Sequence, residues 1–127
     1  MNRTERLQKL VRLQKQVKAL HETRHAMHKA QAIAAETEAR ELVQRFDEEG
    51  SLSGLFPELY NNRIASALTR RDGSETLAQD EVAQIAEANA RTNMVERAYR
   101  DALRKEERES EDRERLEIVE RGAFDAG

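Results

Sequence analysis

Apolar residues recur at a helical period along the first half of the chain. At about 100° per residue, one stripe of positions falls on a single face of a helix. The stripe comprises Leu10, Leu13, Val17, Leu20, His21, Arg24, His28, Ala32, Ala35, Ala39, Leu42 and Phe46. Its repeat is about 3.6 residues, not the 3.5 of a supercoil, so the sequence predicts a long, nearly straight helix over residues 3–48.

The periodic pattern stops at a segment rich in Gly and Ser, which predicts a turn over residues 49–56. Gly50 suits the left-handed residue that ends many helices, and Ser51 and Ser53 favour turns and caps. Pro57 fits the first turn of a following helix, where its missing N–H does no harm. A connection this short makes the two helices antiparallel neighbours.

A second stripe predicts a second helix over residues 57–121. Its members are Tyr60, Ile64, Ala67, Arg71, Ala78, Val82, Ile85, Asn89, Thr92, Tyr99 and Leu103. Gly73 interrupts the stripe, and Ser74 suits the cap of a new helix. A continuous helix and a break at residues 72–74 both remain open. The predicted fold is all-α: a long antiparallel two-helix coiled-coil hairpin forming a single domain over residues 1–127.

The end of the second helix is nearly all charged. Between Arg104 and Glu114, Glu pairs with Arg or Lys at i, i+3 and i+4, which supports a solvated helix. Antiparallel pairing about the turn sets residue 3 opposite about residue 103. Residues 104–121 then project beyond the first helix as a charged helical extension. We expect residues 122–127 to fray.

Composition supports helices and excludes several classes of protein. Charged residues make up 37% of the 127 residues and aromatics 4%, with a formal net charge of −3 and no Cys. Disulfides, zinc–thiolate sites and thiol catalysis are therefore excluded. The sequence has no membrane-spanning stretch and no signal peptide behind its N-terminus, so we expect a cytoplasmic protein. A Gly-rich phosphate loop, a nucleophile elbow and a cleft are also missing, and we predict neither catalytic residues nor enzymatic activity.

The first thirty residues are basic, with eight Lys or Arg against Glu5 and Glu22. A basic helix is one signature of a nucleic-acid binder. Here the cations are spread round the helix without Gly-rich or aromatic neighbours. We therefore interpret them as a solvated face and predict no nucleic-acid partner, keeping a basic-helix nucleic-acid binder as the weakest alternative.

Three histidines share one face of the first helix. His21, His25 and His28 follow an i, i+4, i+7 spacing, which occurs in metal sites and also in polar layers between helices. The antiparallel register predicts that they meet the region of Asp80 and Glu81. No fourth ligand is implied, so we favour a polar layer in the helix–helix seam and predict no bound metal and no cofactor.

Two further clusters are candidates for protein binding. Apolar residues gather around the turn, where they either close the hairpin end or form an exposed docking tip. This cluster comprises Phe46, Leu52, Leu55, Phe56, Leu59 and Tyr60. Next to it, Tyr60, Ile64, Ala67 and Arg71 share one helical face, which suits either the seam or a partner-facing patch.

Four features carry a resemblance to a known family: the N-terminal run from Arg6 to Leu13, the chain length, the hairpin, and the Glu/Arg-rich end with Arg115-Leu116-Glu117. In these features the chain resembles the FliJ-type proteins of flagellar export and their YscO-like relatives in type III secretion. The resemblance covers most of the chain. It implies a cytoplasmic, chaperone-associated stalk that inserts into the hexameric export ATPase, links it to the export gate and escorts export chaperones. A generic self-associating coiled coil, forming a homo-oligomer, is the first alternative.

The resemblance also implies where such partners bind. Tyr60, Ile64, Ala67 and Arg71 are similar to the face by which that family contacts the export gate, although an Arg at the last position departs from the family pattern. The charged extension with the paired termini would meet the ATPase. The candidate partner-binding residues are Tyr60, Ile64, Ala67, Arg71, Phe56 and Leu116.

Overall fold

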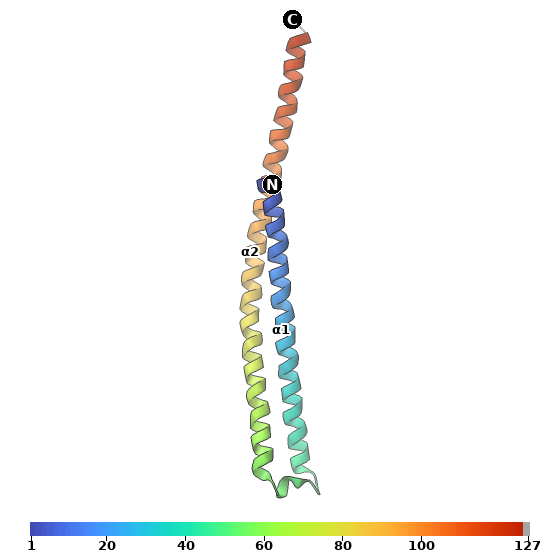
Figure 1. Ribbon diagram of the computed structural model, residues 1–127, viewed down its shortest axis with the longest axis vertical. Helices are drawn as coiled ribbons and strands as arrows, with labels where there is room; N and C mark the ends of the chain where they lie inside the picture. Colours follow the sequence, from blue (N-terminus) through green and yellow to red (C-terminus); the bar gives the residue numbers. More distant parts are fainter. Residues whose placement is uncertain (126–127) are drawn as a thin grey trace. The chain divides into compact units, whose positions relative to one another are not determined.

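The computed structural model describes residues 1–125, and within this range the chain is all-helical. Helix α1 spans Arg3–Asp47, a short 3₁₀ helix η1 spans Leu52–Gly54, and helix α2 spans Pro57–Asp125. The two long helices pack against each other (Figure 1), which confirms the predicted fold class. No helix among the described residues has an apolar stretch long enough to cross a bilayer.

The chain divides into two compact units. We call Val17–Glu87 the turn unit, and Met1–Gln16 with Ala88–Gly127 the terminal unit. Each unit contains one segment of α1 and one of α2, and the two segments run antiparallel.

Cross-helix contacts fix the register inside each unit. In the turn unit, the Glu38 carboxylate is 2.8 Å from the Arg70 guanidinium. In the terminal unit, Nζ of Lys15 lies 3.1 Å from the carboxylate of Glu96. Arg3 lines the same shallow hollow as Ala102, as the predicted register requires.

Small side chains fill the seam of the turn unit. Its buried apolar residues are Ala32, Ala35, Ala39, Leu42, Ala67 and Ala78. Leu42, at 2% exposure, is the largest of them. Alanines at these positions let the two backbones approach closely, and they leave the larger apolar side chains at the edges of the seam or outside it.

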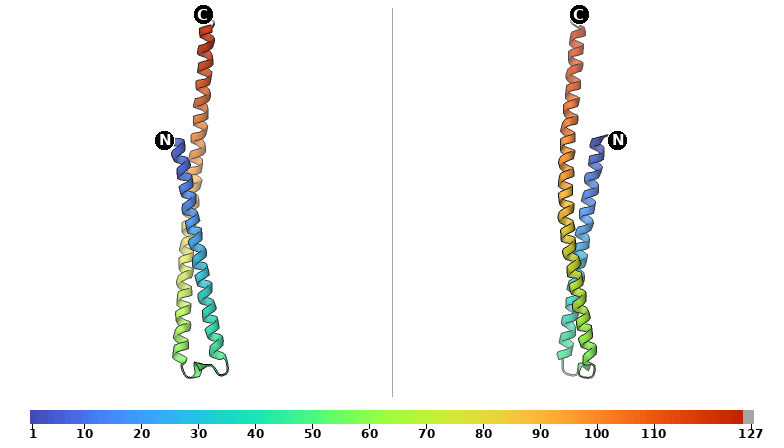
Figure 2. Two further views of the ribbon diagram at one scale, coloured as in Figure 1. Left: turned by 45° about the vertical axis from the view of Figure 1, so that its right-hand side comes forward. Right: turned by 90° about the vertical axis from the view of Figure 1, so that its left-hand side faces the viewer.

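The turn follows the predicted chemistry. Gly50 has a φ of +80°, the left-handed conformation that ends α1. Ser51 caps η1 and accepts a hydrogen bond from the Ser53 N–H, and the Ser53 hydroxyl donates to the carbonyl of Phe46 at 2.8 Å. These bonds satisfy polar groups that the reversal of the chain would otherwise leave unpaired. Figure 2 shows the turn joining the two helices from two further sides.

Helix α2 runs without interruption through residues 72–74, so the continuous alternative is correct there. Gly73 does not adopt a positive φ. A helical Gly costs about 1 kcal/mol relative to Ala, which a long helix with packed neighbours tolerates. The Thr76 hydroxyl also donates to the carbonyl of Asp72 at 3.0 Å, which spans the Gly within the helical turn.

In the terminal unit, Asn2 begins α1 by accepting a hydrogen bond from the Glu5 N–H at 2.8 Å on its side-chain oxygen. Helix α2 continues through residues 122–125, past the end predicted at residue 121, while residues 126–127 lie outside the described range; fraying of this end stays a prediction. Gly122 does not adopt the positive φ that ends many helices, so α2 continues past it.

Candidate functional site

The turn carries a group of four exposed large apolar side chains. Leu52, Leu55, Phe56 and Leu59, which we call the tip cluster, are all more than half exposed, and Leu55 reaches 73%. The N–H groups of Leu55 and Phe56 both donate to the Leu52 carbonyl at 3.0 Å, so the backbone that presents them is internally bonded. These four exposed side chains therefore project from a turn whose backbone is held by its own hydrogen bonds.

The other two aromatic residues near the turn have a different role. Phe46 and Tyr60 pack edge to face across the seam, with ring centroids 6.1 Å apart. This arrangement is favourable for aromatic pairs and closes the end of the seam. Two of the six residues thus close the hairpin end and four remain exposed, while docking of a partner at the exposed four stays a prediction.

The tip cluster borders a hollow with a cation at its edge. Leu52, Phe56, Leu59, Tyr60 and Arg63 line it. Within residues 1–125 no carboxylate pairs with the exposed Arg63. Apolar walls beside an unpaired guanidinium suit a partner that inserts an apolar side chain next to a carboxylate.

The predicted face of Tyr60, Ile64, Ala67 and Arg71 lies in the seam. Ala67 is fully buried at 0% exposure, and the other three are half-buried. Only the outer edges of Tyr60, Ile64 and Arg71 are accessible while α1 is in place. The seam alternative therefore describes their packing, and their contact with a partner stays a prediction.

Arg71 turns toward its sequence neighbour instead of a cross-helix partner. Its Nε and Nη2 atoms donate to one carboxylate oxygen of Asp72, at 3.0 and 2.9 Å. This hydrogen bond raises the pKa of the Arg71 guanidinium above its ordinary value, against the opposing effect of desolvation. Arg71 thus remains a cation on the flank of the seam.

The candidate residue Leu116 lies in a region without burial. Every residue from 104 to 123 is exposed, and Leu116, Ile118 and Val119 are the large apolar side chains within it. Leu116 and Val119 are three residues apart and share one face of α2. This segment offers a narrow apolar strip on an otherwise charged helix.

The predicted histidine layer is present in the seam of the turn unit. Nδ1 of His21 lies 2.6 Å from a carboxylate oxygen of Glu81, with both side chains mostly covered. His25 and His28 are half-buried, and Nδ1 of His28 has no hydrogen-bond partner. Asp80, the other predicted partner, is exposed. No group of three or more His, Asp or Glu side chains within residues 1–125 is arranged to hold a metal ion.

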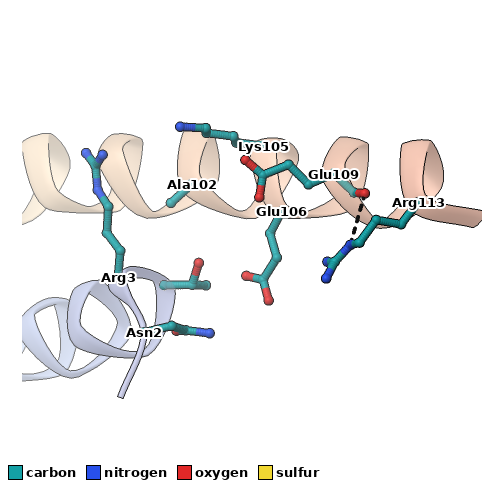
Figure 3. A pocket seen from close by; sticks show the side chains of 8 residues that line it. Asn2, Arg3, Ala102, Lys105, Glu106, Glu109 and Arg113 are labelled. Carbon is teal, nitrogen blue, oxygen red and sulfur yellow. Dashed lines mark hydrogen bonds between the residues drawn. The ribbon is translucent and has the colours of Figure 1, made fainter. Parts of the chain in front are cut away.

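A polar hollow lies beside the start of α1 in the terminal unit (Figure 3). Asn2, Arg3, Lys105, Glu106 and Arg113 contribute to its lining. Glu106 extends from α2 toward the side of the first turn of α1, where acidic groups are favourable because of the helix dipole. The side chains that line this hollow include charges of both signs beside Ala102.

Sequence reasoning missed two features of these surfaces. Arg63 was not singled out, although it follows Leu59 by four residues and so shares its helical face. Gly73 was considered only as a helix breaker, not as part of a surface.

No protein-family model, curated protein or solved structure matches the chain.

Proposed function

We propose that this chain is a non-enzymatic, cytoplasmic stalk or adaptor of a flagellar or type III export apparatus. It binds the export ATPase ring and the export gate and escorts export chaperones. The specific apparatus rests on the resemblance carried by residues 6–13, residues 115–117 and the hairpin. Two packed helices bury one narrow seam, which suits a protein that acts through its outer surface.

The tip cluster is the single observation that carries the proposal. Four large apolar side chains within eight residues are exposed on a backbone held by its own hydrogen bonds. Solvent-exposed apolar groups of this kind mark protein–protein contact sites, and an aromatic residue at their centre is the usual energetic anchor. We assign Phe56 this role, with the accessible edge of Tyr60 beside it, in binding the export gate.

A second contact is assigned to the exposed end of α2. Its alternating charges suit reversible contacts that weaken with salt, and Leu116 adds an apolar anchor. We propose that this segment binds the ATPase ring. The two contacts use different residues, so each can be removed without the other.

The proposal is tested by measuring binding of the full chain to an export ATPase and to the cytoplasmic domain of an export gate protein. Phe56→Ala is expected to weaken gate binding at least about tenfold and to leave ATPase binding unchanged. Leu116→Ala is expected to weaken ATPase binding and to leave gate binding unchanged. Isothermal titration calorimetry or biolayer interferometry gives both dissociation constants.

Ile33→Ala is the matched control, because Ile33 is also an exposed apolar residue of the turn unit but lies outside the tip cluster. It is expected to bind both partners like the unaltered chain. If the unaltered chain bound neither the ATPase nor the gate protein, the export assignment would be refuted. Equal losses for Phe56→Ala and Ile33→Ala would refute the role of the tip.

A further inference from the structure

One flank of the turn unit contains an apolar groove between its two helices. Ala34 and Ala35 of α1 face Gly73 and Leu77 of α2 across it. Leu77 is half exposed and forms one wall. The groove lies on the side of the seam and does not include the tip cluster.

The apolar surface continues along α1. Leu20, Met27 and Ala34 are spaced seven residues apart, which places them on one face of the helix. Leu20 and Met27 are each nearly half exposed. The groove is therefore part of a face with large apolar side chains as well as small ones, and the partner helix of the hairpin does not cover it.

Gly73 gives an independent reason to expect something in the groove. A glycine inside a helix is destabilising relative to alanine, so its presence calls for a backbone or packing requirement. Its φ is not positive, and apart from the helix's own backbone no atom lies within 4 Å of the position that a Cβ would take. Nothing within the described chain needs a glycine there, and at the floor of the groove the missing side chain leaves room for the close approach of a second molecule.

The charges at the edge of the groove indicate what that molecule is. Glu38 and Arg70 line it, pair at 2.8 Å and are both exposed. One charge of each sign gives a neutral rim that is complementary to itself. In a two-fold arrangement, Arg70 of each copy meets Glu38 of the other, whereas a strongly acidic or basic partner would gain nothing from this rim.

We infer that the groove binds a second copy of this chain, forming a two-fold dimer in which four helical segments pack with Gly73 at the close approach. Leu20, Met27 and Leu77 of both copies are then covered, which the two-helix hairpin alone does not achieve. This inference goes beyond the proposed function, because the groove is separate from Phe56 and Leu116.

The dimer is tested by sedimentation equilibrium of the full chain between about 5 and about 500 μM. The unaltered chain is expected to form a dimer. Gly73→Leu fills the close approach and is expected to raise the dissociation constant at least about tenfold without loss of helicity in circular dichroism. Gly122→Leu is the matched control, because Gly122 is also helical and equally open, and it is expected to dimerise normally.

A charge exchange identifies the two-fold geometry. Arg70→Glu gives a rim with two acidic groups, and Glu38→Arg gives one with two basic groups, so each variant alone is expected to be monomeric. An equimolar mixture of the two variants is expected to form a heterodimer, because the rims are then complementary. A monomeric unaltered chain at the highest concentration, a Gly73→Leu variant that dimerises normally, or a mixture that stays monomeric would each overturn the inference. These readouts involve no export component, so they are independent of the proposed function.

Discussion

Residues 57–103 and residues 104–123 belong to the same continuous helix, but they are stabilised in different ways. The first part is covered at regular intervals by α1, with Ala67, Ala78, Ala88 and Thr92 buried. The second part has no buried residue. It relies on helix propensity and local contacts, such as the hydrogen bond of 3.3 Å from the Arg113 side chain to the carbonyl of Glu109.

The comparison separates two sources of helicity that give the same secondary structure. Tertiary packing holds residues 57–103, so a substitution there disturbs both helices at once. Residues 104–123 form a helix that depends on its own sequence. Such a segment loses little when one side chain changes, and its surface stays free for other molecules.

The largest difference between the seam that covers residues 57–103 and the exposed residues 104–123 is expected from removing a leucine, and the seam leucine lies on the α1 side. Leu42→Ala deletes the one large side chain that is almost fully covered in the seam, and we expect a loss of about 2–5 kcal/mol in the free energy of unfolding. Leu116→Ala removes the same atoms from the exposed part and is expected to change it by less than about 0.5 kcal/mol. Urea denaturation followed by circular dichroism measures both. Equal losses would mean that residues 104–123 are packed.

A smaller difference is expected from adding volume. Ala67→Leu forces a larger side chain into a seam position with no exposed surface, which costs about 1–3 kcal/mol. Ala123→Leu adds the same atoms to an exposed helical position and is expected to be nearly neutral. Thermal melts of the two variants provide the check. A tolerated Ala67→Leu would show that the helices can separate there without cost.

The smallest difference is expected from the polar contacts. Glu81→Gln removes the charge of the group that bonds His21 in the mostly covered layer but keeps an accepting oxygen, and a loss of about 0.5–1.5 kcal/mol is expected. Asp101→Asn removes the exposed partner of Arg104 and is expected to cost a few tenths of a kcal/mol. Denaturation midpoints at low ionic strength distinguish them. If both variants lost the same amount, the histidine layer would be no more than a surface contact.

Much of the fold followed from residue patterns. The spacing from Leu10 to Phe46 predicted α1 to within one residue of its end at Asp47. Gly50 and Pro57 marked the turn correctly, because their backbone restrictions are local. The antiparallel register, which sets His21 near Glu81, follows from counting residues outward from the turn, and the structure confirms it.

The candidate site was less predictable. Pattern alone left Leu52, Leu55, Phe56 and Leu59 either closing the hairpin or exposed, and the structure leaves them exposed because Phe46 and Tyr60 already fill the end of the seam. The same pattern allowed Ala67 to face a partner, yet it is buried. Periodicity shows that residues share a face but does not show what covers the face.

The sequence by itself determined the two helices, the turn and their antiparallel order, because helical period, glycine and proline act over a few neighbouring residues. The tertiary structure alone decided which apolar side chains are covered. A pair of helices buries one stripe on each, and side-chain volume and register decide which residues fall inside it. Leu42 and the seam alanines lie inside, whereas the tip cluster and the groove at Gly73 remain outside.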